Sequence, residues 1–221
     1  MALKTDHVLH VSLAQFEIDY SDSNYYNGND IHTCIIICLI GDNMKLSTCN
    51  PNNADEIEQL FIKTFTDSEG QSEGELIGGL VKDFMDSTDA NDLYCFIATE
   101  DGQIIGSVFF SRMTFESGIN AFILSPVAIH TDHQGKGVGQ KVINFGLNVL
   151  KEDGVELAIT YGDPNFYSKV GFSVITEQVI PAPQKLAQPE GWLAQSLVGI
   201  EIEPIAGKSH CVEALNKPEL W

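Results

Sequence analysis

Basic residues are scarce in this sequence. Its 221 residues include 12 Lys and Arg against 31 Asp and Glu, and the formal net charge is −19 at pH 7. No basic stripe occurs anywhere along the chain. Nucleic-acid phosphates and anionic membranes attract cationic surfaces and repel anionic ones. We therefore expect neither nucleic acid nor a membrane surface as a partner.

Long apolar runs are also missing. The most apolar stretch, residues 31–40, contains CIIICLI and is about ten residues long, too short to span a bilayer. We interpret it as a buried or edge strand. Lys4 is the only base near the start, and no small-residue cleavage site follows an apolar segment, so we expect no signal peptide.

Paired cysteine motifs are absent as well. The five cysteines, at positions 34, 38, 49, 95 and 211, are odd in number and include no C-x-x-C pair. Cys34 and Cys38 lie four apart in the apolar run, with no histidine in metal-ligand order, and we interpret them as core residues. The pattern favours reduced thiols in a cytoplasmic protein and predicts no metal site.

The composition that remains is that of a globular protein. Hydrophobic residues make up 43% of the chain. A chain of this length suits one domain with a full core, or one domain with an extension.

The most informative stretch is Leu124–Gly139, LSPVAIHTDHQGKGVG. An apolar strand leads into a turn with three glycines, and helical spacing follows in Val138, Val142, Phe145 and Val149. Glycines allow backbone N–H groups to approach a ligand, and the next helix adds free N–H groups and the positive end of its dipole. The turn therefore suits a phosphate or pyrophosphate. The P-loop pattern is absent, and a dinucleotide fingerprint counted from Gly135 would need glycine at Gln140.

The turn resembles the coenzyme A loop of the GCN5-related N-acetyltransferases. Its spacing matches Q/R-x-x-G-x-G/A at Gln134, Gly137 and Gly139, and the preceding strand fits L-x-x-V-x-V at Leu124, Val127 and Ile129. An aromatic-Tyr-x-x-x-Gly-Phe segment follows at residues 166–172, as in that family. The alternative is a sharp strand-to-helix turn without a ligand.

The resemblance covers residue 44 to about residue 172, and more loosely the rest. The Tyr-Gly-Asp-Pro run at 161–164 and the final Asn-Lys-Pro-Glu-Leu-Trp at 216–221 are similar to bacterial predicted N-acetyltransferases of unassigned substrate. The resemblance implies an α+β fold with three layers, α/β/α, of the acyl-CoA N-acyltransferase type. Its mixed, mostly antiparallel sheet would be splayed at the fourth family strand.

Residues 44–221 would form the N-acetyltransferase domain, and residues 1–43 an extension outside it. Two interpretations of the extension stay open. It is an added arm or extra strand, or Met44 is the true start and the upstream stretch is a translation-start error. We favour the second, because residues 1–30 are polar and have no clear period.

Local patterns predict the remaining elements. We expect Asn53 and Glu56 to cap a helix whose apolar face is Ile57, Leu60, Phe61 and Phe65. The other expected elements are a connection at 67–75, a helix at 75–85, strands at 93–99 and 103–111 joined by Asp101-Gly102, a strand at 119–130 interrupted at Pro126, a helix ending at Gly154, and strands at 155–160, 172–176 and 197–203.

The resemblance also implies how acetyl-CoA is held. Val127, Ala128 and Ile129 would pair with pantetheine, and a backbone N–H near 127 would polarise the thioester carbonyl. The pyrophosphate would be held by the loop residues Gln134, Gly135, Lys136, Gly137, Val138 and Gly139. Lys136 either adds charge to this site or is a solvated surface lysine. We expect His133 to cap the turn.

Tyr167 matches the family's general acid, which protonates the departing thiolate. The glutamate that some members place on the central strand falls at Ile123, so we expect a base from the first helices or a water chain. Many members carry an asparagine where this chain has Thr160. Asp163-Pro164 is instead typical of a helix cap and first turn.

The acceptor is less well indicated. Residues 67–101 hold ten acids and one base, Lys82. An acidic rim would attract an amine-bearing cation, but global acidity is the interpretation we favour. The sequence thus predicts an acetyl-CoA-dependent N-acetyltransferase acting on a primary amine of a small molecule or protein. The alternatives are a non-catalytic acyl-CoA sensor and an acyltransferase for a longer acyl chain, and a homodimer is one option for the assembly.

Overall fold

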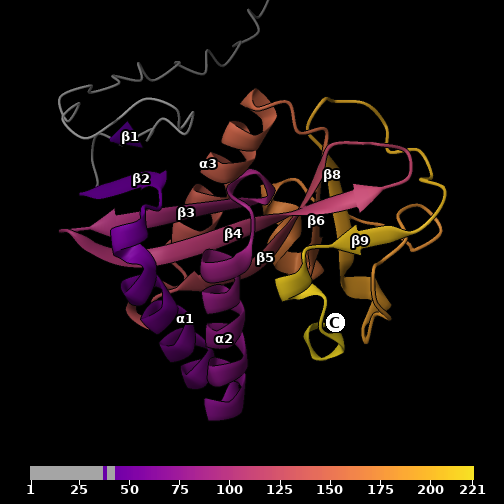
Figure 1. The fold of residues 1–221 in the computed structure, drawn as a ribbon. Coiled ribbons are helices and arrows are strands. Elements are labelled where there is room, and N and C mark those ends of the chain that lie inside the picture. The colour runs from indigo at the N-terminus through magenta and orange to yellow at the C-terminus, as the bar shows by residue number, and fades with distance from the viewer. Residues whose placement is uncertain (1–36, 39–42) are drawn as a thin grey trace, which may run out of the picture.

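The computed structural model describes residues 37–38 and 43–221 (Figure 1). Its helices are α1 (Ala54–Glu69), α2 (Gln71–Ser87), α3 (Val138–Glu152) and α4 (Pro164–Tyr167). Its strands are β1 (Ile37–Cys38), β2 (Met44–Thr48), β3 (Leu93–Glu100), β4 (Gln103–Phe115), β5 (Ala121–Ile129), β6 (Leu157–Tyr161), β7 (Ser173–Val174), β8 (Trp192–Ser196) and β9 (Ser209–Cys211).

These strands form one sheet in the order β1-β2-β3-β4-β5-β6-β8-β7, with β9 paired to β4 beyond β5. β5 and β6 are parallel, and the other pairings are antiparallel. Helix α3 makes the crossover between the two parallel strands, as parallel pairing requires. The predicted mixed, mostly antiparallel sheet is confirmed.

Helices cover both faces of the sheet (Figure 1). One core joins α1 and α2 to the sheet, and a second core joins α3 to the opposite face. Successive residues of β3 alternate between them: Cys95 and Ile97 belong to the first core, Phe96 and Ala98 to the second. The three-layer α+β fold is therefore confirmed.

The central hairpin forms as predicted. Asp101 has φ 50° and Gly102 has φ 81°, the two positive angles that a tight two-residue hairpin turn needs. β3 and β4 pair on either side of this turn from Glu100 and Gln103 outward.

The predicted cap of the first helix is wrong. Asn50 starts a 3-10 turn instead: its side chain accepts from the Asn52 N–H at 2.9 Å, and the Asn53 side chain accepts from the Asn50 N–H at 3.0 Å. The Glu56 carboxylate accepts from the Ile104 N–H at 2.8 Å, and so ties α1 to β4. The predicted apolar face of α1 does pack into the core.

The predicted connection at 67–75 is wrong as well. Gly70 alone joins α1 to α2, with φ 101°. Gly74 and Gly78 lie inside α2, where they allow close contact with α1. A Cβ at Gly78 would come within 2.4 Å of Ile62 Cγ1, and one at Gly74 within 2.6 Å of the Ile62 carbonyl oxygen. Glycines that suggest a loop are here the contact surface between two helices.

The predicted strand at 197–203 is wrong, because the strand is β8, five residues earlier. The buried residues Trp192, Leu193 and Ala194 anchor β8 between β6 and β7. The apolar alternation after it suggested a strand, yet Val198 is 49% exposed and Ile200 67%. The expected strand at 172–176 is limited to β7.

The apolar run at 31–40 contributes β1, an edge strand that pairs with β2. The remainder of the run, including Cys34, and the side chain of Cys38 lie outside the described residues. Within residues 37–38 and 43–221, no helix is both long enough and apolar enough to cross a membrane. The same residues include no group of three or more His, Cys, Asp or Glu side chains that could hold a metal ion.

Candidate active site

The sheet opens between β5 and β6. Their pairing ends at Leu124 and Thr160, whereas β5 continues to Ile129. The β4–β5 register shifts at the same point, because Val108 pairs with Val127 and Phe110 with Leu124. Two residues of β5, one of them Pro126, thus face one residue of β4. This is the predicted bulge, and it turns the end of β5 away from β6.

The backbone of β5 alternates along this open edge. The His130 N–H donates to the Ile105 carbonyl at 2.9 Å, and the register pairs Ala128 with Ser107. Since backbone groups in an antiparallel ladder face the partner at every second residue, Ala128 directs its N–H and C=O to β4. Val127 and Ile129 direct theirs into the opening.

The loop after β5 forms a nest at the start of α3. Gly135 and Gly137 have φ of 71° and 80°, and a Cβ on either would meet no atom within 4 Å. Gly137 caps α3 without a side-chain hydrogen bond, and the first helical bond runs from the Lys141 N–H to the Gly137 carbonyl. The N–H groups of the first turn therefore face open space, an arrangement that suits an anion.

Side chains of the loop fix its position on β5. Gln134 Nε2 donates to the Ile129 carbonyl at 3.0 Å. The predicted capping role of His133 is wrong, because the His130 ring accepts from the Asp132 N–H at 3.3 Å. His133 instead places Nε2 2.9 Å from Glu100 Oε2.

Tyr167 lies at the end of α4, beside the opening. Its ring packs edge-on against Phe166 and Phe172, with centroids at 5.1 Å and 5.9 Å. A Cβ at Gly162 would come within 2.8 Å of Tyr167 Cε2, so the absence of a side chain there leaves room for the ring. Burial raises the pKa of Tyr167, a hydrogen bond with Thr160 lowers it, and the charge of Asp163 raises it further. The net shift is upward, which keeps the phenol protonated in neutral solution.

Asp163 and Thr160 have structural contacts of their own. The Asp163 carboxylate accepts from the Asn165 N–H at 2.9 Å and caps α4, with Pro164 in its first turn, as predicted. The Thr160 hydroxyl donates to the Leu124 carbonyl at 3.0 Å, at the last paired position before the opening. Ile123 is buried, so no carboxylate occupies its position on β5.

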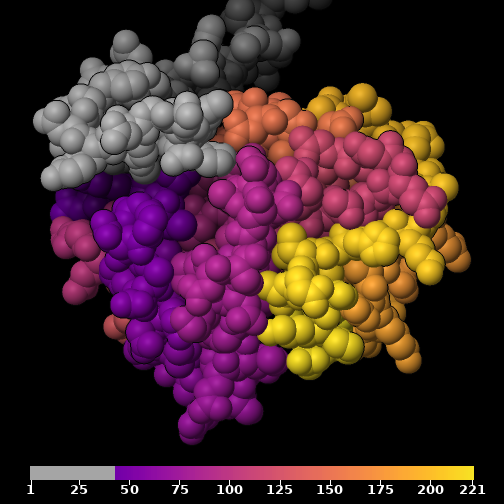
Figure 2. All heavy atoms as spheres, in the orientation of Figure 1, coloured from indigo at the N-terminus to yellow at the C-terminus, as the bar shows by residue number. Residues whose placement is uncertain are grey.

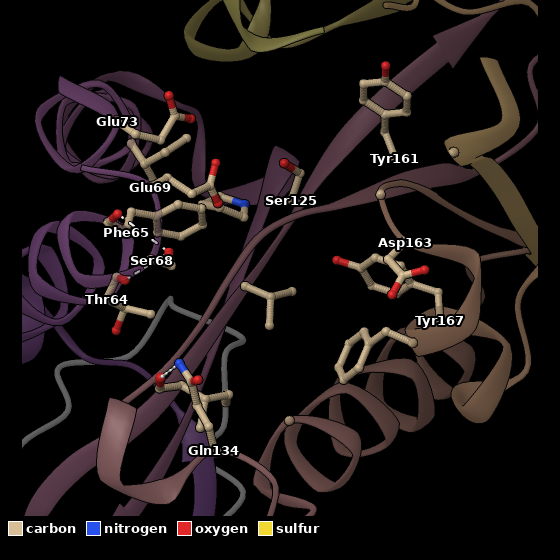
Figure 3. A pocket seen from close by; sticks show the side chains of 18 of the residues that line it. Thr64, Phe65, Ser68, Glu69, Glu73, Ser125, Gln134, Tyr161, Asp163 and Tyr167 are labelled. Carbon is tan, nitrogen blue, oxygen red and sulfur yellow. Dashed lines mark hydrogen bonds between the residues drawn. The ribbon is translucent and has the colours of Figure 1, made fainter. Parts of the chain in front are cut away.

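One cavity of about 930 Å³ joins these parts (Figure 3). It is lined by eight of the ten predicted site residues: Val127, Ile129, Gln134, Gly135, Gly137, Val138, Gly139 and Tyr167. Two others do not line it. Ala128 is buried on the α1–α2 side of the sheet, and Lys136 is exposed.

The sequence did not indicate the far wall of this cavity. Glu69 at the end of α1 and Glu73 in the first turn of α2 lie across the cavity from Tyr161 and Tyr167 (Figure 3). Neither glutamate has an ion-pair partner among the described residues. The only hint in the sequence was the acidic content of residues 67–101.

The C-terminal segment completes that wall. Trp221 lines the cavity and stacks on Tyr161, with centroids 6.2 Å apart and an interplanar angle of 18°. The segment lies against α2 (yellow beside magenta in Figure 2), where Lys217 Nζ is 2.7 Å from Asp83. Nothing in the local pattern of residues 216–221 predicts this contact.

Comparison with known proteins identifies the domain. The family model of the acetyltransferase (GNAT) domain matches residues 91–174. The chain is 26% identical over 152 residues to the uncharacterized N-acetyltransferase YjhQ of Escherichia coli, covering 66% of this chain and 80% of YjhQ. It is 29% identical over 126 residues to the uncharacterized N-acetyltransferase YhbS of Escherichia coli, covering 56% of this chain and 70% of YhbS.

Solved structures show the same fold. The crystal structure of Escherichia coli YhbS in complex with CoA aligns with a TM-score of 0.65 at 23% identity, covering 78% of this chain and 91% of YhbS. A GNAT family acetyltransferase from Brucella melitensis in complex with acetyl-CoA aligns with a TM-score of 0.55 at 24% identity, covering 78% of this chain and 97% of that one. The matched residues include β3 to α4, the elements that build the cavity. This chain therefore carries an acetyltransferase domain of the GCN5-related N-acetyltransferase family.

Proposed function

We propose that this protein transfers an acetyl group from acetyl-CoA directly to a primary amine of a small molecule or protein. One observation carries the proposal: a single cavity connects the anion-binding start of α3, the open edge of β5 and Tyr167 with an acidic wall on the opposite side. Such a cavity can hold an acyl donor and an amine acceptor in contact, which is what direct transfer requires.

The residues present fit acetyl-CoA. The nest around Gly135 and Gly137, with the free N–H groups of α3, suits the pyrophosphate. Val127 and Ile129 direct backbone groups into the opening, where an amide-bearing chain can pair with them. Bound acetyl-CoA supplies the thioester that the amine attacks.

The protein contributes three functions to the reaction. The Val127 N–H donates to the thioester carbonyl oxygen and stabilises the charge that develops there. Tyr167 holds its proton until the thiolate departs and then donates it. A carboxylate of Glu69 or Glu73, directly or through water, accepts the proton that the ammonium loses. Direct attack by the amine needs no enzyme nucleophile.

The acceptor wall favours a cationic amine. Glu69 and Glu73 are carboxylates without an ion-pair partner in the described part of the chain, and both line the cavity. The nearby acids Asp67, Asp83 and Asp86 are each paired with a lysine. The unpaired carboxylates are thus those that a positively charged acceptor would meet.

The test has two steps. The first is a thermal-shift titration with acetyl-CoA, with NAD and ATP in parallel, because a ligand that binds the native state raises the melting temperature. The second measures release of free CoA thiol with a panel of mono-, di- and polyamines and lysine peptides. We expect a shift with acetyl-CoA alone and saturable thiol release with at least one amine.

Tyr167→Phe separates catalysis from binding. The phenylalanine keeps the ring packing and removes the proton donor, so we expect turnover to fall about 100-fold or more while acetyl-CoA binding is kept. Tyr94→Phe is the matched control, since the Tyr94 hydroxyl bonds Asp153 and Tyr94 lies outside the cavity. Unchanged turnover in Tyr167→Phe would remove the acid role. Binding without turnover on any amine would favour the acyl-CoA sensor, and turnover only with propionyl- or succinyl-CoA the longer-chain acyltransferase.

A further inference from the structure

The two ring nitrogens of His133 lie in different surroundings. Nε2 is 2.9 Å from Glu100 Oε2 at the end of β3. Nδ1 is buried and has no hydrogen-bond partner among the described residues. The residue ends the 3-10 turn Thr131–His133, directly before Gln134, and lines the cavity next to the predicted pyrophosphate loop. Glu100 thus fixes the ring, while its second nitrogen is left without a partner.

The contact with Glu100 determines where the ring carries hydrogen. A carboxylate only accepts hydrogen bonds, so Nε2 carries the proton. Nδ1 then has two states: an unshared lone pair in the neutral ring, or a second N–H in the imidazolium. A buried nitrogen without a partner is costly in either state. An anion that enters the cavity supplies an acceptor for the second state only.

The charges around His133 are balanced between its neighbours. Glu100 faces it from β3, and the His130 ring lies edge-on at 5.7 Å from the same turn. Asp132 lies 3.9 Å from His130 Nδ1 and is largely exposed. Among the cavity-lining residues, His133 and Lys169 are the two side chains that can carry positive charge. An imidazolium at His133 would therefore place a cation beside a loop that otherwise offers backbone N–H groups.

We propose that His133 is a phosphate-binding residue of the acetyl-CoA site and that it takes up a proton when the cofactor binds. In the bound state Nδ1–H donates to a phosphate oxygen, and Glu100 orients the ring and stabilises its positive charge. The proton comes from solvent, and no covalent bond changes. This inference rests on the proposed function, because it names a residue and a proton linkage at the same cofactor site.

Calorimetry of cofactor binding tests the proposal. Titrations of acetyl-CoA at the same pH in two buffers of different ionisation enthalpy give the number of protons taken up. S-acetylpantetheine, which lacks the phosphates, is titrated in parallel. We expect the wild-type protein to take up part of a proton with acetyl-CoA near neutral pH and none with S-acetylpantetheine.

His133→Gln removes the titrating group and keeps a polar side chain. We expect acetyl-CoA to bind it roughly tenfold more weakly, with no proton uptake, and S-acetylpantetheine to bind as it does to wild type. His210→Gln is the matched control: His210 is an exposed histidine on β9 outside the cavity, and its loss should leave both ligands and the proton count unchanged.

Glu100→Gln tests the supporting role of the carboxylate. Removal of its charge disfavours the imidazolium, so we expect proton uptake to occur only at lower pH, with weaker acetyl-CoA binding at neutral pH. Circular dichroism melting curves check that each variant is folded. A structural role alone would weaken both ligands equally and would leave proton uptake intact.

The outcomes separate this inference from the proposed function. Tight binding of acetyl-CoA by wild type without proton uptake, together with equal affinity in His133→Gln, would overturn the role of His133 and leave the proposed function standing. Absence of acetyl-CoA binding by folded wild-type protein would overturn both.

Discussion

Gly139 and Phe166 are in contact. A Cβ at Gly139 would lie 3.3 Å from Phe166 Cζ and 3.4 Å from Ile129 Cγ1. Gly139 is in the first turn of α3, next to the anion-binding nest, and Phe166 directly precedes Tyr167. The glycine loop and the aromatic segment, which lie far apart in the sequence, therefore meet across one missing side chain.

Enlarging Gly139 should push the two parts of the site away from each other. Gly139→Val adds atoms where α4 and β5 already fill the space, so we expect a loss of about 1–3 kcal/mol in the free energy of unfolding. We also expect weaker acetyl-CoA binding, measured by calorimetry. Gly139→Ala is the graded control, with a smaller loss on both measures. Equal cofactor affinity in the valine variant and wild type would contradict the positioning argument.

The cofactor half of the site could be predicted because its signals are local. Glycines and helical spacing mark the loop at 134–139, and the segment at 166–172 has a fixed spacing. The acceptor half could not be predicted in this way. Its wall combines Glu69 and Glu73 with Tyr161 and Trp221, and no period or spacing indicates that these residues face one cavity.

Glycine shows the same limit within a single segment. Gly70 ends α1 with φ 101°, whereas Gly74 and Gly78 lie within α2. The sequence suggests a loop for this segment because glycine is typical of turns. Only the packing of α2 on Ile62 distinguishes a glycine that breaks a helix from one that brings two helices together.

Adjacent glycines of α2 should respond in opposite ways to alanine. A Cβ at Gly78 would lie 2.4 Å from Ile62 Cγ1, so Gly78→Ala must separate α1 from α2 and should cost about 1–3 kcal/mol of stability. Gly79 is exposed, and a Cβ there would meet nothing within 4 Å. Gly79→Ala should stabilise the protein by roughly 0.5–1 kcal/mol, because glycine is a poor helix former. Urea titrations measure both, and a common sign for the two changes would contradict the packing described.

Removal of charge from the acidic wall should affect the acceptor and leave the cofactor alone. For Glu69→Gln and Glu73→Gln we expect the KM of a dicationic acceptor to rise roughly two- to fivefold, with an effect that shrinks at high salt. Acetyl-CoA affinity should stay constant. Glu75→Gln is the matched control, since Glu75 is exposed on α2, outside the cavity, and bonds Gln71. Equal changes in all three variants would indicate a general effect of protein charge.

The thiols of Cys49 and Cys95 should differ in reactivity from that of Cys211. The Cys49 N–H donates to the Cys95 carbonyl at 2.9 Å, across β2 and β3. A hydrogen bond from the Cys95 thiol lowers the pKa of Cys49, while burial raises the pKa of Cys95 above its usual value. Burial also raises the pKa of Cys211, to about 11. Both Cys49 and Cys211 are partly buried, so their access to a reagent is comparable.

Alkylation by iodoacetamide, followed residue by residue by mass spectrometry, measures this difference. The thiolate is the reacting form, and its fraction rises as pH passes through the pKa. At pH 8 we expect Cys49 to react faster than Cys211, whose rate should still increase above pH 10. Cys95→Ala removes the hydrogen bond and should slow Cys49 at pH 8. If Cys211 reacts as fast as Cys49 in folded protein, or if Cys95→Ala leaves the Cys49 rate unchanged, the thiol pair does not set the reactivity of Cys49.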